Sequence, residues 1–166
     1  KAFIGALQAD PDNVVANRAM AAFTVATGRY RDAEVYLQHL AKSGDPSSVF
    51  TLTDYYIASG RAKDAIVRLE ALGKERKDIP NLGERLARAY AAGGDNTRAK
   101  SLIEQVLAGN PAAVDAQLLK GQLLLNEGHK EEAFTAVKAA ASSNPQSAEA
   151  QFALGRVFAS RGDKAA

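Results

Sequence analysis

Hydrophobic residues between positions 82 and 109 follow the three- to four-residue spacing of α-helices, in two stretches. The first stretch carries its apolar face on Leu82, Leu86, Ala89 and Tyr90, and the second on Ala99, Leu102, Ile103, Val106 and Leu107. Between them, Gly94 suits the left-handed conformation that ends a helix, and Asp95 suits the cap of the next helix. Asn110–Pro111 ends the second stretch, because proline disfavours helical geometry in the residue before it. The pattern predicts two antiparallel helices joined by a tight turn.

The same pattern recurs along the chain with a period close to 34 residues. A turn glycine is followed five residues later by an alanine in "GRYRDA", "GRAKDA", "GDNTRA" and "GHKEEA", which begin at residues 28, 60, 94 and 128. The glycines are 32, 34 and 34 residues apart, and Gly162 follows after another 34. We expect each alanine to sit where the paired helices approach most closely, since only a small side chain fits there. These alanines are Ala33, Ala65, Ala99 and Ala133.

Small and large residues also alternate at fixed distances from the turn glycine, as close-packed helix layers require. Seven residues before it the chain has Ala21, Thr53, Ala87, Gly121 and Gly155. Four residues before it the side chain is usually large, at Tyr56, Tyr90, Leu124 and Phe158, with Thr24 as the exception. Nine residues after it stand Leu37, Leu69, Ile103 and Val137.

These residues and their period resemble the tetratricopeptide repeat (TPR), and the resemblance covers essentially the whole chain. Pro111 and Pro145 stand seventeen residues after their glycines, where the family places its proline. The first unit is two residues short, and the second ends late, at Ile79–Pro80. The chain also departs from the family where a large aromatic residue is usual near the start of the first helix, with Asn17, Val49, Gly83, Gln117 and Gln151 in its place.

The resemblance implies an all-α fold, a superhelix (α-α solenoid) of antiparallel helix pairs in a single array. Residues 1–11 are expected to form the second helix of a truncated repeat, and residues 148–166 the first helix of another. Complete repeats are expected at 12–45, 46–79, 80–113 and 114–147. The chain opens inside a helical pattern and stops soon after a turn, so we expect a segment of a longer protein. Its alanine-rich units resemble those of bacterial TPR proteins, including proteins of polysaccharide export and envelope assembly.

In the family, the first helices line a concave groove through positions thirteen, ten, six, three and two residues before the turn glycine. The resemblance therefore implies a non-catalytic scaffold that binds a peptide segment or a partner protein in this groove. Carried over position by position, the expected partner-binding residues are Arg18, Phe50, Asp54, Ile57, Asn81, Glu84, Arg88, Leu118, Gln122, Leu125, Asn126, Phe152 and Arg156.

Some of these residues are large and apolar, such as Phe50, Leu118, Leu125 and Phe152. They do not belong to the stripe that packs each helix pair, so we expect them on the groove surface. Leaving a large apolar side chain in water costs about 1.5–3 kcal/mol. Two interpretations follow: the four residues close the groove by contacting one another, or they form a mixed apolar and polar peptide site.

One specialised TPR function is not expected. Repeats that hold the C-terminal carboxylates of heat-shock chaperones use a clamp of Lys, Asn and Arg on the first helices. This chain has Arg18 with Ala22 and Phe50 with Asp54, where a Lys with an Asn would be required. Chaperone-tail binding is therefore not predicted.

The amino-acid composition argues against several other classes of protein. Hydrophobic residues make up 46% of the chain, which argues against disorder. No run approaches the roughly 18 apolar residues of a membrane-spanning helix, so membrane insertion by this segment is not expected. A net charge of +2 is too small to indicate nucleic-acid binding. The absence of cysteine excludes disulfides and thiol catalysis, and fits cytoplasm or cell envelope equally, so localisation stays open.

No candidate catalytic, cofactor or metal site emerges from the motifs. His39 lies among leucines, which indicates a half-buried or surface histidine. His129 lies near Glu131 and Glu132, but no second histidine or cysteine converges on it to hold a metal. The acidic pair suits a helix start. No Ser/His/Asp arrangement, P-loop or dinucleotide fingerprint occurs, so we expect no enzyme activity and no cofactor.

Other functions stay open beside the scaffold. The chain could be a structural spacer that self-associates through its ends or convex face, or the substrate-recruiting region of a larger enzyme or of an envelope or polysaccharide-export assembly. An RNA-binding helical repeat is disfavoured by the apolar groove residues. Terminal helices lack neighbours in an array, so we expect end-to-end association through Phe3, Ile4, Leu7, Leu154 and Phe158.

Overall fold

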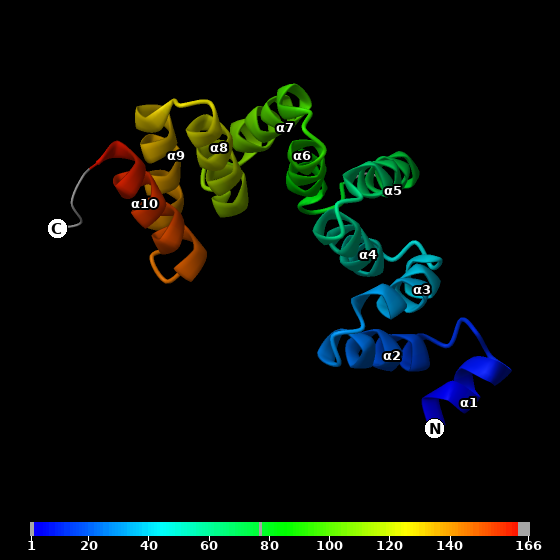
Figure 1. The fold of residues 1–166 in the computed structure, drawn as a ribbon. Coiled ribbons are helices and arrows are strands. Elements are labelled where there is room, and N and C mark those ends of the chain that lie inside the picture. Colours follow the sequence, from blue (N-terminus) through cyan, green and yellow to red (C-terminus); the bar gives the residue numbers. More distant parts are fainter. Residues whose placement is uncertain (1, 77, 163–166) are drawn as a thin grey trace. The chain divides into compact units, whose positions relative to one another are not determined.

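The computed structural model describes residues 2–76 and 78–162, and these residues form helices and no strands (Figure 1). The chain divides into two compact units, residues 1–79 and 80–166, here called the N-terminal and the C-terminal unit. The N-terminal unit holds α1 (Ala2–Ala9), α2 (Val14–Ala26), α3 (Tyr30–Ala41), α4 (Pro46–Ala58) and α5 (Ala62–Glu75). The C-terminal unit holds α6 (Leu82–Ala92), α7 (Asn96–Gly109), α8 (Val114–Asn126), α9 (Lys130–Ser143) and α10 (Ala148–Arg161). The all-α prediction is confirmed.

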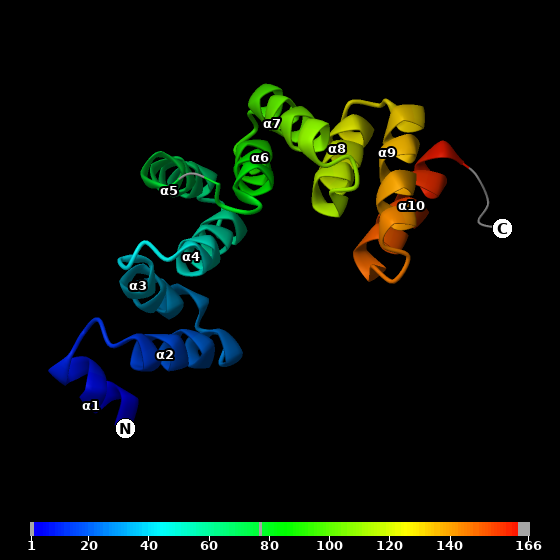
Figure 2. The same cartoon turned by 180° about the vertical axis from the view of Figure 1, so that it is seen from behind.

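Consecutive helices pack as antiparallel pairs within each unit. In the N-terminal unit α2 pairs with α3 and α4 with α5, while α1 rests on α2 and α3 contacts α4. In the C-terminal unit α6 pairs with α7 and α8 with α9, and α10 lies against both α8 and α9 (Figure 2). The first helices α6, α8 and α10 also contact one another in sequence. The face formed by first helices is therefore continuous in the C-terminal unit.

The predicted helix ends and caps are present in the structure. Gly28, Gly60, Gly94 and Gly128 have φ between 73° and 84°, the left-handed region that ends a helix. The next residue then donates its N–H back to the helix, as Asp95 does to the carbonyl of Tyr90 at 2.9 Å. Asp95 in turn caps α7 by accepting the N–H of Arg98. The sequence signals thus fix both sides of the turn at Gly94, whereas α3, α5 and α9 begin without a side-chain cap.

The two helices of each pair pack closely where their side chains are small. The turn alanines Ala33, Ala65, Ala99 and Ala133 are each 0% exposed, which confirms their placement at the tightest points. The large residues nine positions after the glycines are buried as well, with Leu69 at 0% and Ile103 and Val137 at 1%. Each pair therefore has its own narrow apolar seam in place of one central core.

Polar residues that replace the family's aromatic residue have a structural role that the sequence did not reveal. The side-chain amide of Asn17 donates to the carbonyl of Pro11 at 2.8 Å. Gln117 donates in the same way to Pro111, and Gln151 to Pro145. The bond joins each first helix to the proline six residues earlier, so it fixes the turn that enters the helix pair.

Two glycines at equivalent positions of successive repeats allow a matched stability test. A Cβ added at Gly121 would lie 2.3 Å from Cγ2 of Val137, whereas a Cβ at Gly155 would meet nothing within 4 Å. Val137 is buried, and a β-branched side chain has one preferred rotamer in a helix, so it has little room to move. We expect Gly121→Ala to lower the free energy of unfolding by about 1–2 kcal/mol. Gly155→Ala should raise it by about 0.5–1 kcal/mol, because alanine favours helices. Urea denaturation measures both, and shifts of equal sign would contradict the packing.

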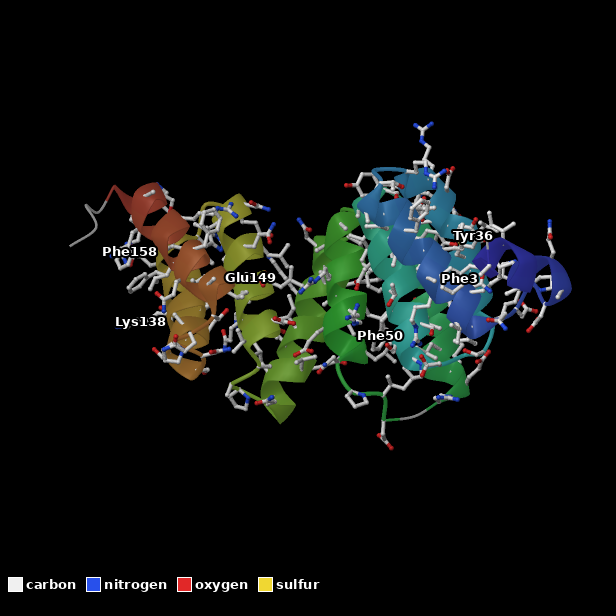
Figure 3. The ribbon with its side chains drawn as sticks, turned by 90° about the horizontal axis from the view of Figure 1, so that it is seen from below. Phe3, Tyr36, Phe50, Lys138, Glu149 and Phe158 are labelled. Atoms are coloured by element: carbon white, nitrogen blue, oxygen red, sulfur yellow. The ribbon has the colours of Figure 1, made fainter. Side chains whose placement is uncertain are left out.

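Apolar side chains of α1 remain in contact with solvent. Phe3 is 46% exposed and Ile4 53% exposed, while Leu7 is half-buried. At α10, Leu154 and Phe158 are half-buried, and the ring of Phe158 packs edge-on against Phe134 with 5.3 Å between centroids (Figure 3). End-to-end association through these residues stays a prediction.

Candidate functional site

A hollow with a volume of about 790 Å³ lies in the N-terminal unit. Among the residues that the structure describes, the backbones of α2 and α4 do not approach each other, and α3 contacts both. Leu37 and Leu40 of α3 therefore form the floor between the two first helices. This N-terminal hollow is lined by Arg18, Ala21, Ala22, Val25, Leu37, Leu40, Ser47, Ser48, Thr51, Asp54, Tyr55 and Ala58.

Two local features of the sequence accompany this opening. The α2 wall carries small side chains at Ala21 and Ala22, which leave space above α3. The repeat between Gly28 and Gly60 is also the one that is two residues short, and the loss falls in α3, which has 12 residues where α7 and α9 each have 14. The hollow thus occurs in the part of the N-terminal unit that departs from the regular period.

The walls of the N-terminal hollow combine hydroxyl groups with one charge of each sign. The hydroxyl of Ser48 donates to Asp45 at 3.0 Å, and that of Thr51 donates to the carbonyl of Ser47 at 2.9 Å. Hydrogen bonds from the Ser48 backbone and side chain lower the pKa of Asp45, with smaller contributions from the charges of Arg76 and Arg18. The positive charge of Arg18 is therefore felt at the end of the hollow where α4 begins, and Asp54 lies two turns further along α4.

Part of the predicted partner-binding set lines this hollow. Arg18 and Asp54 do so. Ala22 and Val25 also line it, and they stand six and three residues before Gly28, as Asp54 and Ile57 do before Gly60. Phe50 and Ile57 lie on α4, are half-buried, and do not line the hollow. The contributions of Thr51 and Tyr55 were not predicted, because the family positions assume first helices that lie next to each other.

A second hollow lies in the C-terminal unit, between α8 and α10 and above Val137 of α9, with a volume of about 230 Å³. Glu149 projects from α10 toward α8 at its edge (Figure 3). Five predicted residues meet here, from two helices. This C-terminal hollow is lined by Leu118, Gln122, Leu125, Val137, Glu149, Phe152, Ala153 and Arg156.

The apolar residues of the C-terminal hollow differ in how far they are covered. Leu118 is only 9% exposed and belongs to a core cluster with Val137 and Val157, and Leu125 packs against that cluster. The expectation that Leu118 lies outside the packing is therefore wrong, because α10 covers the side of α8 that carries it. Phe152, in contrast, is 70% exposed. The hollow has a packed floor and one open aromatic ring.

The predicted residues on α6 lie outside both hollows. Arg88 approaches Asp115 of α8 at 3.9 Å between Nη2 and Oδ2. Burial, and then the Asp115 carboxylate, raise the pKa of Glu84, and the guanidinium groups of Arg88 and Arg85 oppose this. Asn81 precedes α6 with a left-handed φ of 63°, so it does not sit on the helix face as predicted. Asn126, the last residue of α8, is exposed and lines neither hollow.

Outside the two hollows, both histidines of the chain take part in surface ion pairs. His39 Nδ1 lies 2.5 Å from Oδ1 of Asp12, and Lys42 lies 2.8 Å from the same oxygen. Hydrogen bonds from Lys42 and His39 lower the pKa of Asp12. His129 lies 3.8 Å from Glu132. Within residues 2–76 and 78–162, no three metal-ligating side chains gather, and no helix is long and apolar enough to cross a bilayer.

Comparison with known proteins places this arrangement in a family. A model of the tetratricopeptide repeat matches residues 84–146 and 121–166. The chain belongs to the tetratricopeptide repeat family. TPR is generally a non-enzymatic protein-interaction fold, and the repeats of this TPR protein therefore suit a scaffold. A search of curated proteins gave no match.

Solved TPR structures share its fold at low sequence identity. TTC0263, a thermophilic TPR protein of Thermus thermophilus, is 18% identical with a TM-score of 0.74, over 95% of this chain and 87% of that one. MamA from Desulfovibrio magneticus is 19% identical with a TM-score of 0.65, over 90% and 86%. YrrB, a TPR protein described as having an unusual peptide-binding site, is 17% identical with a TM-score of 0.58, over 99% and 86%.

Proposed function

We propose that this TPR protein is a non-catalytic interaction scaffold whose N-terminal hollow holds a peptide segment of a partner protein. The observation that carries the proposal is the hollow of about 790 Å³ between α2 and α4. This volume falls within the range of about 300–1,000 Å³ that is typical of ligand sites. The similarity to YrrB, a TPR protein with an unusual peptide-binding site, supports the same class of ligand.

The composition of the hollow favours a peptide over a small metabolite. Its floor is apolar at Leu37 and Leu40, which suits the burial of one or two side chains. Its rim offers hydroxyl groups, and Arg18 and Asp54 supply opposite charges on different helices. A peptide backbone presents N–H groups at short intervals, and the hydroxyl oxygens of Ser48 and Thr51, whose protons are donated to Asp45 and to the Ser47 carbonyl, can accept from them.

Filling the hollow should abolish peptide binding without unfolding the protein. Ala22 is exposed and lines the hollow, so an indole ring in Ala22→Trp would occupy the space where the peptide lies. Ala71, exposed on α5 of the same unit and outside the hollow, provides the matched control Ala71→Trp. We expect peptides selected from a random phage library to bind at least about ten-fold more weakly to Ala22→Trp, because hot-spot contacts carry most of the affinity. Binding to Ala71→Trp should equal wild type.

Fluorescence anisotropy of labelled synthetic peptides measures these affinities. The chain has no tryptophan, so each variant carries a single indole, and a change of its emission on peptide addition reports contact directly. Circular dichroism confirms that both variants keep the helical fold. Equal binding by wild type and both variants would show that the peptides bind elsewhere and would overturn the N-terminal hollow as the site.

A further inference from the structure

Phe152 is the most open large side chain beside a hollow in the C-terminal unit. Its ring is 70% exposed on α10, at the edge of the C-terminal hollow. Glu149 stands one turn before it and Arg156 one turn after it, and both line the same hollow. An aromatic side chain buries a large area when a partner covers it. The three residues therefore present a ring between an acid and a base.

The size of the hollow limits what it can hold. Its volume of about 230 Å³ exceeds the roughly 150 Å³ of an engineered apolar cavity that binds benzene. It is smaller than the roughly 300–1,000 Å³ of typical cofactor and drug sites. Leu118, Leu125 and Val137 make its floor apolar. One aromatic or leucine-sized side chain fits this space, and a ligand of cofactor or drug size does not.

The charges of Glu149 and Arg156 limit which ligands suit the hollow, in addition to its size. Glu149 and Arg156 are seven residues apart on one helix, or about 10.5 Å along its axis at about 1.5 Å per residue. Both side chains are exposed, and within residues 78–162 the structure shows no ion-pair partner for either. A ligand with one positive and one negative group on opposite sides of its apolar group would complement them.

We propose that the C-terminal hollow takes one apolar side chain from an extended segment of a partner protein, with a cationic residue beside Glu149 and an anionic residue beside Arg156. Alternate residues of an extended chain point to the same side. A charge–x–apolar–x–charge pattern therefore presents all three groups together, with about 13 Å between the outer residues at about 3.3 Å each. Long charged side chains cover the small difference from the spacing on α10.

An extended segment suits this site better than a helical one. Isolated helices shorter than about 12–15 residues are marginal in water, so a short segment would have to form its helix on binding. The backbones of α8 and α10 also contact each other, which leaves room between them for a side chain and none for a helix of about 10 Å diameter. The inference rests on the proposed scaffold function and names the partner sequence at a second site.

Five synthetic heptapeptides test the pattern by NMR titration of the isotope-labelled protein. Two carry opposite charges on the two sides of phenylalanine (GKSFSEG and GESFSKG), because the peptide can lie along α10 in either direction. Two carry like charges (GKSFSKG and GESFSEG), and one replaces the ring by alanine (GKSASEG). We expect at least one mixed-charge peptide to bind about two- to five-fold more tightly than both like-charge peptides. Loss of the ring should weaken binding at least about ten-fold.

A charge reversal in the protein supplies the decisive comparison. Arg156→Glu makes both flanking groups acidic, so its preferred peptide should change to GKSFSKG. Lys138→Glu alters the net charge equally on the exposed face of α9, outside the hollow, and should keep the wild-type preference (Figure 3). The same change of preference in both variants would indicate a long-range charge effect and would overturn the inference.

The result also separates this inference from the proposed scaffold function. If the heptapeptides cause no shifts in α8 and α10 while peptides selected on the N-terminal hollow still bind and respond to Ala22→Trp, only the present inference fails. If no peptide binds at either hollow, the scaffold proposal fails as well.

Discussion

Replacement of Ala99 by leucine is expected to lower the free energy of unfolding by about 1–3 kcal/mol. Ala99 is 0% exposed on the first turn of α7, where α7 packs against α6. Leucine adds three carbon atoms at this point, and a close-packed interior has no void to receive them. The helices must separate or the new side chain must adopt a strained rotamer, and either change weakens the pair.

A matched control shows how much an alanine-to-leucine change alters stability at an exposed position of the same helix. Ala108 is exposed near the end of the same helix, and alanine and leucine have similar helix propensities. We expect Ala108→Leu to change stability by less than about 0.5 kcal/mol. Urea denaturation followed by circular dichroism measures both variants. An Ala99→Leu protein as stable as Ala108→Leu would contradict the close approach of α6 and α7 at the alanine.

The fold was accessible from the sequence because each repeat carries its own local signals. Glycines with positive φ, Asp95 as a cap and the buried alanines each follow from the chemistry of single residues. The 34-residue period repeats those signals, so the helix bounds could be set within a few residues. Neighbouring repeats interact only locally, which makes this prediction independent of any long-range pairing.

The candidate site was less accessible, because it depends on how far neighbouring first helices lie apart. Partner binding by Arg18, Asp54, Phe152 and Arg156 stays a prediction. The family positions include the first two, which line the N-terminal hollow, and the last two, which line the C-terminal hollow. They did not reveal that α2 and α4 open a space for Tyr55 and Thr51. Sequence periodicity indicates which face of a helix a residue occupies. Whether that face is covered depends on how the neighbouring helices pack against it.

Leu118 illustrates this limit, and its replacement gives the other large effect. Leu118→Ala is expected to lower the free energy of unfolding by about 2–3 kcal/mol, the low end of the roughly 2–5 kcal/mol typical of buried leucines. The side chain is 9% exposed and packs in the cluster with Val137 and Val157. It also borders the hollow of about 230 Å³, so the space it leaves opens into that hollow and is not a sealed cavity.

Phe152→Ala is the control for this prediction, since it removes a larger side chain from the edge of the same hollow. Because Phe152 is 70% exposed, its loss should change the stability of the free protein by less than about 0.5 kcal/mol. Urea denaturation of the two variants measures the difference. Similar losses in both would show that the floor of the hollow is not packed as described. A large loss in Leu118→Ala alone means that this substitution weakens the fold as well as the hollow, so Phe152→Ala becomes the variant that isolates the contact with a partner.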